Sequence, residues 1–433
     1  MKKNKKESVD KLEEFSIASC GTGGGASNSN IVNFETILAD FGSASKYDAF
    51  NRLRISDPFT IFDSHNRYNR NNLFNETCVG TGTTVTYRVN ESVLDMIVGT
   101  GASAEIIRES NKVFPYQPGK SLLIMNSFAF ASTKANLRQR IGYFGAQNGI
   151  YFEQLGDEKF FVLRSYVTGS IQETRIPQSQ WNGYKFDGSE FYIRNLDPSK
   201  ANIFWCDIEW LGVGDVRVGF IVDGKPIVGH TFHNDNLNTT TYMTTAVLPL
   251  RQEIANIAGT SSTSTMKAIC ATVISEGGYQ AKTNMNFQSS IVNSSIDLGT
   301  AGTRRPIISI RLNSNELDAV VLPVQADIAC TNNDVIKYEL ILNGSIGSSV
   351  TWTRYNSTSG VDYAIGGTTI TGGTLINGGF TVQKTAGSIG GIDNFGTQLG
   401  RLLNGTSDVI TLVCSSNGNN SNVVGALGWY ELT

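Results

Sequence analysis

Residues 205–232, which read WCDIEWLGVGDVRVGFIVDGKPIVGHTF, constrain the fold more than any other part of this chain. Val216, Val218 and Phe220 recur at every second position, which is the period of a strand with one apolar face. Asp223 and Gly224 follow, and both tolerate the positive φ angles that a tight hairpin needs. The segment therefore predicts an antiparallel meander of short strands, the unit from which β-sandwiches are built.

Short strand patterns separated by turn residues continue on both sides of this meander. Through residues 77–285 they show almost no helical period, which is typical of a sandwich or a barrel. A Ser- and Asn-rich stretch at residues 286–300 marks a boundary, and further strand patterns follow it. The sequence thus predicts an all-β protein, with a jelly-roll-like antiparallel sandwich at residues 77–285 and a second, smaller β-sandwich at residues 286–433.

The first 76 residues have a different pattern. Residues 1–30 predict an extended or helical arm, because Val9, Leu12 and Phe15 recur near helical spacing before the Gly-rich linker CGTGGGASNSN. A frayed terminus is the alternative. Residues 31–76 mix aromatic residues with Arg and Asp, which favours local Arg–Asp pairing and docking on other subunits over nucleic-acid stacking. The candidate docking residues are Arg52, Arg54, Phe59, Phe62, Arg67 and Tyr68.

Charge and cysteine content argue against several classes of function. The formal net charge is −3 and 17% of residues are charged, so no nucleic-acid partner is expected, because such a partner usually requires a basic surface. The six cysteines form no CxxC pair, so no metal site is predicted and the thiols are expected to be reduced. The start, MKKNKKESVDKLEEF, has no apolar signal core, and no long apolar run occurs. We therefore expect neither a secretion signal nor a membrane span.

Residues that could carry catalysis are sparse. No GxSxG motif occurs, and His230, His233 and Asp235 are interpreted as residues at a strand end rather than as a base with its orienting acid. Asp207 and Glu209 are expected on one strand face at roughly 7 Å, a spacing that a glycosidase could use, although nearby basic residues could simply neutralise them. The sequence therefore predicts no enzyme, no catalytic residue and no cofactor.

One loop carries a candidate binding function. Trp181, Tyr184 and Phe186 form an aromatic loop that could stack on sugar rings, although a loop Trp more commonly packs against its own sheet. Oxygen donors at Asp223 and in residues 233–236 leave calcium binding open, although their spacing is not that of an EF-hand.

Five segments carry a resemblance to a known family. They are DAFNRLRISDPFTIFDS (48–64), QRIGYFGAQNGIYFE (139–153), QSQWNGYKFDG (178–188), IEWLGVGDVRVGFIVDG (208–224) and YMTTAVLPLRQEI (242–254). In this order they resemble a family of tailed-bacteriophage virion structural proteins. The middle region is also similar to the concanavalin-like jelly roll, in which a WLG-type strand and a DG hairpin recur. The resemblance implies a virion component, and it implies that the C-terminal β domain decorates the particle or binds a surface.

These observations together predict a bacteriophage virion structural protein that is made in the host cytoplasm and incorporated into the virion. We expect a head- or tail-attached fibre or spike component. It docks on other virion proteins through its N-terminal region and presents its β domains for assembly or for binding a host-surface glycan. A homo-oligomer is expected, with a trimer favoured. The alternatives are a capsid cement or decoration protein and a carbohydrate-cleaving tail enzyme.

Overall fold

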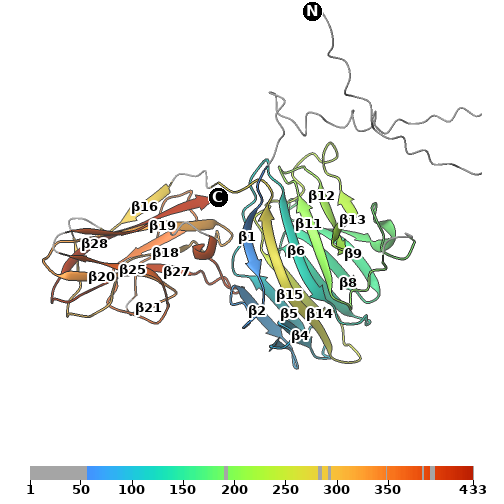
Figure 1. Cartoon of the computed structure of the whole chain (residues 1–433), viewed down its shortest axis with the longest axis horizontal. Helices are drawn as coiled ribbons and strands as arrows, with labels where there is room; N and C mark the ends of the chain where they lie inside the picture. The colour runs from blue at the N-terminus through green and yellow to red at the C-terminus, as the bar shows by residue number, and fades with distance from the viewer. Residues whose placement is uncertain are drawn as a thin grey trace, which may run out of the picture. The chain divides into compact units, whose positions relative to one another are not determined.

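The computed structural model of the protein describes residues 56–189, 194–280, 285–290, 294–347, 349–382, 385–390 and 395–432. Residues 56–433 form one compact unit. The arm predicted for residues 1–30, together with Arg52 and Arg54, lies outside the described residues. Nearly all regular structure within the described residues is β-strand (Figure 1), which confirms the all-β prediction.

Two antiparallel sheets form the first sandwich, and we name each sheet after its central strand. The β6 sheet contains, in spatial order, β13 (Lys225–Phe232), β12 (Val216–Val222), β11 (Asn202–Ile208), β6 (Leu122–Ala129), β15 (Ser264–Ser275), β4 (Val93–Val98) and β3 (Thr84–Arg88), and β1 (Phe59–Ser64) also pairs with β15. The β7 sheet contains β10 (Gln172–Pro177), β9 (Glu158–Ser165), β8 (Gly149–Leu155), β7 (Leu137–Phe144), β14 (Leu250–Asn256), β5 (Glu105–Ser110) and β2 (Phe74–Val79). A single 3₁₀ turn, η1 (Gln178–Gln180), follows β10.

The strand period explains which side chains face the interior. β6 reads LLIMNSFA and alternates buried with half-buried side chains along its whole length, so Leu122, Ile124 and Phe128 point inward. The meander predicted from residues 205–232 is confirmed, because β11 pairs with β12 and β12 pairs with β13. Asp223 makes the turn between β12 and β13 with a φ of 49°, as its place before Gly224 predicted.

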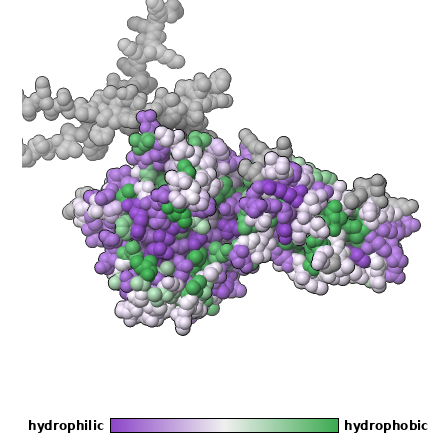
Figure 2. All heavy atoms as spheres, turned by 180° about the vertical axis from the view of Figure 1, so that it is seen from behind, coloured by the Kyte–Doolittle hydropathy of each residue, from purple (hydrophilic) through white to green (hydrophobic). Residues whose placement is uncertain are grey.

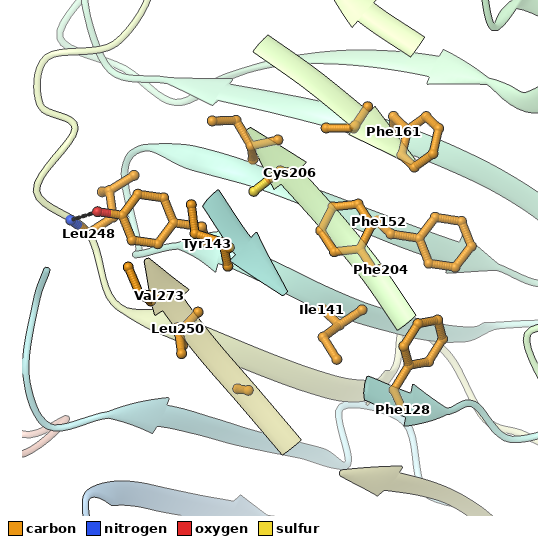
Figure 3. Packing of buried hydrophobic residues seen from close by; sticks show 14 of the residues in the cluster. Phe128, Ile141, Tyr143, Phe152, Phe161, Phe204, Cys206, Leu248, Leu250 and Val273 are labelled. Carbon is orange, nitrogen blue, oxygen red and sulfur yellow. Dashed lines mark hydrogen bonds between the residues drawn. The ribbon is translucent and has the colours of Figure 1, made fainter. Parts of the chain in front are cut away.

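Aromatic rings fill the space between the two sheets (Figure 3). The rings of Phe152 and Phe220, from opposite sheets, meet edge to face with 5.1 Å between their centroids. Tyr143 is fully buried, yet its hydroxyl lies 2.8 Å from the carbonyl oxygen of Ala246 and accepts the N–H of Leu248 at 3.1 Å. Burying one large apolar side chain stabilises a fold by about 1.5–3 kcal/mol, so this core dominates the stability of the sandwich.

A second sandwich follows, also built from antiparallel sheets. The β28 sheet contains β16 (Met285–Ser289), β28 (Asn422–Leu432), β19 (Val320–Cys330) and β26 (Ala386–Ile389), and β17 (Ile296–Asp297) also pairs with β28. The β27 sheet contains β22 (Thr353–Arg354), β23 (Val361–Ile365), β18 (Arg305–Leu312), β27 (Val409–Ser416), β20 (Val335–Leu342) and β25 (Thr374–Val382). β21 (Ser345–Ile346) pairs with β24 (Ile370–Thr371), and η2 (Phe395–Thr397) is a single 3₁₀ turn. Trp429 is fully buried at the centre of this second core.

The first sandwich begins earlier in the chain than the sequence predicted. β1 and the start of β2 fall within residues 31–76, the expected docking segment, but β1 pairs with β15 and β2 pairs with β5. Both strands are short and flanked by Arg, Asn and Asp, so the period of two is too brief there to be distinguished from an irregular segment. The sandwich therefore starts at Phe59 and not at residue 77.

The two sandwiches are joined by a bridge that we call the Arg401 brace, formed by Arg401, Glu109, Asp318 and Asn111. The guanidinium of Arg401 pairs with Glu109 of β5 at 2.9 Å and with Asp318, between β18 and β19, at 2.8 Å. The backbone N–H of Arg401 donates to the carbonyl oxygen of Asn111 at 2.8 Å. The Glu109 side chain is only 2% exposed, so its pair with Arg401 is shielded from water.

Candidate functional site

The predicted docking residues that the structure describes differ in burial. Phe62 is 7% exposed and belongs to the core, where its ring lies 4.8 Å from that of Phe114. Phe59 is 42% exposed and Tyr68 is 82% exposed, with the Arg67 guanidinium 5.0 Å from the Tyr68 ring. Phe62 is therefore excluded from docking by burial, whereas Phe59, Arg67 and Tyr68 are exposed, with the Phe59 ring stacked on Tyr279.

The aromatic loop is also divided between core and surface. Trp181 and Phe186 are each 2% exposed, and the Trp181 ring stacks on Phe161 with 4.0 Å between centroids. The indole N–H of Trp181 donates to the carbonyl oxygen of Ile176, so its polar atom is satisfied inside the protein. The prediction that Trp181 and Phe186 stack on sugars is wrong, because neither ring has a face open to solvent. Tyr184, which is 46% exposed, can still do so.

The same loop covers the edge of β13. Asn182 accepts the N–H of Thr231 at 2.8 Å through Oδ1 and donates to the carbonyl oxygen of Thr231 at 2.9 Å through Nδ2. The backbone N–H groups of Gly183 and Tyr184 donate to the next two carbonyl oxygens along this edge, those of Gly229 and Val228. A side-chain amide thus takes the place of a neighbouring strand at Thr231, and the loop backbone satisfies the carbonyl oxygens of Gly229 and Val228.

Beside this loop lies a hollow of about 480 Å³, which we call the edge hollow. It opens where the edge of the β6 sheet meets the edge of the β7 sheet, and the loop after β13 forms one wall. Its lining residues share a neutral, hydroxyl-rich character: Leu163, Ser165, Thr174, His230, Thr231, Phe232, His233, Asn234, Asn238, Thr239, Thr240, Thr241 and Tyr242.

His230 is the titratable group built into this wall. Its side chain is 7% exposed, and burial together with the nearby His233 lowers the pKa of His230 to about 4. The backbone N–H of Asn182 donates to Nδ1 of His230 at 3.2 Å. A neutral imidazole that accepts through one nitrogen carries its proton on the other, so Nε2 is a hydrogen-bond donor.

The base-and-acid arrangement considered for His230, His233 and Asp235 does not form. His233 pairs instead with Asp215, at 2.9 Å between Nδ1 and Oδ2, and Asp235 is exposed. Asn234 donates to the carbonyl oxygen of Gly214, which holds the loop after β13 against the loop before β12. These contacts fix one rim of the edge hollow.

A second hollow, of about 460 Å³, lies on the outer face of the β6 sheet, and we call it the acid hollow. Its lining residues are Gly119, Lys120, Ser121, Asp207, Glu209, Asp215 and Arg217. Asp207 is ion-paired with Arg217 and accepts the Ser121 hydroxyl at 2.7 Å. β11 ends at Ile208, so Glu209 does not continue the strand face of Asp207 as the sequence predicted.

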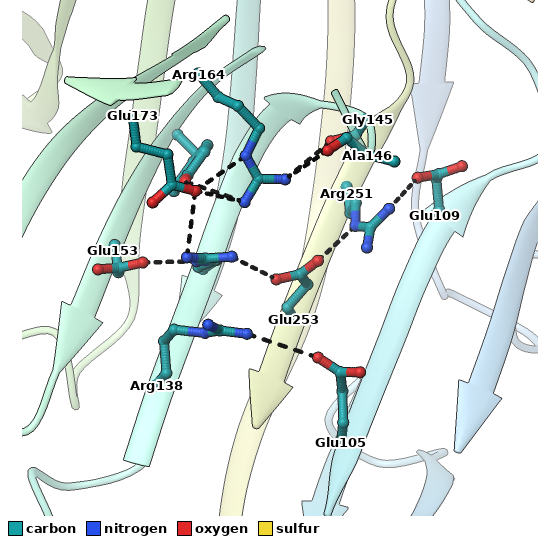
Figure 4. Close-up of polar contacts among 12 residues, drawn as sticks. Glu105, Glu109, Arg138, Gly145, Ala146, Glu153, Arg164, Glu173, Arg251 and Glu253 are labelled. Carbon is teal, nitrogen blue, oxygen red and sulfur yellow. Dashed lines mark hydrogen bonds and ion pairs between the residues drawn. The ribbon is translucent and has the colours of Figure 1, made fainter. Parts of the chain in front are cut away.

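The outer face of the β7 sheet carries a buried network of Arg and Glu side chains (Figure 4). Arg140 pairs with Glu153 at 2.6 Å and with Glu253 at 3.4 Å, and Arg251 pairs with Glu253 at 2.6 Å and with Glu109 at 2.8 Å. Burial alone would raise the pKa of Glu253, but Arg251 and Arg140 outweigh it and hold that pKa below its usual value.

Hydrophilic residues also occupy broad areas of the surface visible in Figure 2, with apolar residues in small separate spots.

No group of three His, Cys, Asp or Glu side chains in the described residues is placed to hold a metal ion. Asp223, one candidate oxygen donor for calcium, pairs with Arg194 at 2.9 Å. The five cysteines in the described ranges are all unpaired, and Cys78 and Cys270 are exposed. In the same part of the chain, no helix is long and apolar enough to cross a membrane.

The solved structures that are similar to this chain match about half of its length. No protein-family model matches the sequence, and no curated protein matches it, so the resemblance to a virion family is not confirmed by either route. Among solved structures, a glycoside hydrolase family 16 endo-glucanase from Bacteroides ovatus is 10% identical, with a TM-score of 0.33 over 49% of this chain and 99% of that one. The CBM2 module of Lactobacillus casei BL23 phage J-1 evolved Dit is 7% identical, with a TM-score of 0.33 over 52% and 100%. A legume lectin-like domain from Entamoeba histolytica is 10% identical, with a TM-score of 0.29 over 46% and 89%.

One sequence-based prediction is contradicted by this comparison. The chain was expected not to be an enzyme, yet several of the similar structures are glycoside hydrolases or glucanases. With identities of 7–13% and TM-scores of 0.29–0.34, we take neither a ligand nor a reaction from these structures for this chain.

Proposed function

We propose that this chain is a structural component of a tailed-bacteriophage particle, attached through its N-terminal region and presenting its two sandwiches for assembly or for contact with the host surface. A fibre or spike position is the specific form of this proposal, with a homotrimer as its assembly. The five segments that carry the resemblance include β1 and β12 and parts of β7, β8 and β14, which belong to both sheets of the first sandwich.

The observation that carries this proposal is the Arg401 brace. A protein that presents binding surfaces at a distance from its attachment point needs its domains held in a fixed relation. Arg401 reaches carboxylates in both sandwiches, and the Nε2 group of Gln398 donates to the carbonyl oxygen of Val113 at 2.9 Å beside it. Charge-assisted hydrogen bonds to a buried carboxylate are among the stronger polar contacts in proteins.

The N-terminal attachment is tested by deleting residues 1–30 and measuring incorporation into particles. We expect the truncated chain to fold, with an unchanged β signal in circular dichroism, and to be absent from purified particles. Normal incorporation would remove the anchoring role.

Copy number and solution mass separate the two structural alternatives: a fibre or spike is an isolated stable trimer, whereas a cement protein is abundant and monomeric until it meets a capsid.

A second candidate, carbohydrate cleavage, is favoured by one observation. Asp207, Glu209 and Asp215 line the same acid hollow, and glycosidases use two carboxylates that flank the scissile bond. Asp207 is held in place by its ion pair with Arg217 and by the Ser121 hydroxyl, whereas Glu209 has no ion-pair partner among the described residues. Reducing-end assays on bacterial surface polysaccharides test this candidate. Activity that is present in the natural chain and lost in Glu209→Gln, with the fold retained, would support cleavage over a purely structural role.

A further inference from the structure

We propose that the edge hollow is a binding site for an uncharged, polyhydroxylated ligand, namely a neutral pyranose unit of a host-surface glycan. This inference rests on the host-contact half of the proposed function and names the ligand class and the site. The proposed site does not include Trp181 and Phe186, which are buried. It lies instead on the neighbouring wall formed by β13 and the loop that follows it.

The first observation is a set of hydroxyl groups without partners. Five threonines line the hollow, and none of their hydroxyls has a hydrogen-bond partner among the described residues: Thr174, Thr231, Thr239, Thr240 and Thr241. A threonine hydroxyl donates one hydrogen bond and accepts two, which matches the dual character of sugar hydroxyls. The hollow therefore offers donors and acceptors together rather than one kind alone.

The second observation is the fixed donor of His230. Asn182 occupies Nδ1, and Nε2 has no hydrogen-bond partner within the described part of the chain. The imidazole is neutral at physiological pH, so it presents one N–H without a positive charge. A neutral donor of this kind binds a hydroxyl or ether oxygen without requiring an anion.

The third observation concerns charge. No Asp, Glu, Lys or Arg belongs to the lining of the edge hollow, and the lining residue His233 is already bound to Asp215 at 2.9 Å. An anionic ligand would leave its charge unpaired there, and a cationic ligand would find only the already paired carboxylate of Asp215. The lining thus favours a neutral ligand over the acidic sugars that also occur on bacterial surfaces.

The fourth observation is the combination of size and apolar floor. Small-ligand pockets measure about 300–1,000 Å³ and combine apolar walls with a few polar groups, and the edge hollow, at about 480 Å³, falls within this range. Leu163 and Phe232, each 6% exposed, supply apolar surface at its base. A pyranose has a C–H face that covers such surface while its hydroxyls reach the threonines and His230.

The test uses the full chain and saturation-transfer difference NMR with glucose, galactose, mannose and N-acetylglucosamine, and in parallel with glucuronic acid and N-acetylneuraminic acid. We expect at least one neutral sugar to bind, and the acidic sugars to bind more weakly. Thr240→Val, in an exposed loop, and His230→Asn, which keeps an acceptor for Asn182 but removes the Nε2 donor, should each weaken binding by about tenfold, the equivalent of one lost hydrogen bond. Thr84→Val, on the exposed β3 strand outside the hollow, should leave binding unchanged.

Three results would overturn the assignment: no neutral sugar binds, an acidic sugar binds best, or binding survives in both hollow variants. Failure of this inference is distinguishable from failure of the proposed function, because incorporation into particles does not require the hollow. Particles carrying Thr240→Val should assemble normally and adsorb to cells less well. Normal adsorption by those particles, with sugar binding lost in the purified chain, would also overturn the role of the site in host contact.

Discussion

Single residues beside the edge hollow show how closely the backbone is packed there. A Cβ at Gly183 would lie 2.5 Å from the carbonyl oxygen of Val228 and 3.0 Å from that of Gly229. The loop must approach β13 this closely for Asn182 to bond both backbone groups of Thr231. Any side chain at position 183 therefore pushes the loop away from the strand. The same shift displaces the N–H of Asn182 that orients His230.

Gly183→Ala should consequently destabilise the protein by about 1–3 kcal/mol, the usual effect of forcing a methyl group into a packed site. Urea denaturation followed by tryptophan fluorescence measures this change. Gly101→Ala is the matched control, because no atom lies within 4 Å of the Cβ that it adds. Equal stabilities of the two variants would show that the loop shifts without cost.

His230 gives a prediction for the pH dependence of stability. Its pKa is about 4 in the folded protein, below its ordinary value of 6.5, so the unfolded chain binds the additional proton first as pH falls. The contribution of His230 is complete above about pH 6.5 and is lost progressively down to about pH 4. Urea denaturation across this range should show a shallower decline for His230→Asn than for the natural chain. A parallel decline in the two proteins would contradict the lowered pKa.

At the scale of elements, β14 shows what the sequence pattern can and cannot reveal. The strand reads LRQEIAN, and all seven of its side chains are buried although three are Arg, Gln or Glu. Leu250 and Ile254 face the core, whereas Arg251 and Glu253 are buried on the opposite face by partners on β5 and β7. These partners are distant in sequence, so no local period could predict the burial.

The same distinction explains the other successes and failures of the sequence analysis. The meander of β11 to β13 was predictable because alternation and an Asp-Gly turn are local signals. Trp181 is buried because its ring stacks on Phe161, and β1 joins a sheet because it pairs with β15. Both partners are distant in the sequence from the residues that they contact, so no local pattern indicates these contacts. The edge hollow was missed for the same reason, and the Thr239–Thr241 run was its only local signal.

Breaking the Arg–Glu network of the β7 sheet should lower the free energy of unfolding substantially. Glu253→Gln removes the charge that neutralises Arg140 and Arg251 at a buried position, and we expect a loss of about 3–5 kcal/mol in the free energy of unfolding. Asp223→Asn is the control, because its pair with Arg194 is exposed and such pairs contribute about 0–1 kcal/mol. Chemical denaturation of both variants at neutral pH makes the comparison. A small effect at Glu253 would mean that water reaches the two guanidinium groups.

At the scale of the whole molecule, the two sandwiches have separate cores that meet through few residues. Val113 of the first sandwich packs with Val320 and Leu322 of the second, and the Arg401 brace lies beside this small cluster. The limited apolar contact means that the polar brace carries a large share of the coupling between the two cores.

Arg401→Ala should therefore separate the unfolding of the two sandwiches. In differential scanning calorimetry we expect the variant to show two resolved unfolding transitions, and the natural chain to show transitions that are closely coupled. The reason is that the variant leaves the buried Glu109 without one of its partners. Arg311→Ala is the control, since Arg311 pairs with Asp362 inside the second sandwich. If both variants leave the calorimetric profile unchanged, the apolar cluster alone couples the sandwiches.

The amide of Asn182 has a consequence for how concentrated this protein can become. The unpaired N–H and C=O groups of an exposed edge strand can pair with the edge strand of another molecule, and repeated pairing of this kind leads to aggregation. Here the donor and acceptor that an incoming strand would seek on Thr231 are already occupied by Asn182, within the same chain. The protein can thus reach a high concentration without pairing through Thr231 of this edge, while its other surfaces stay free to associate.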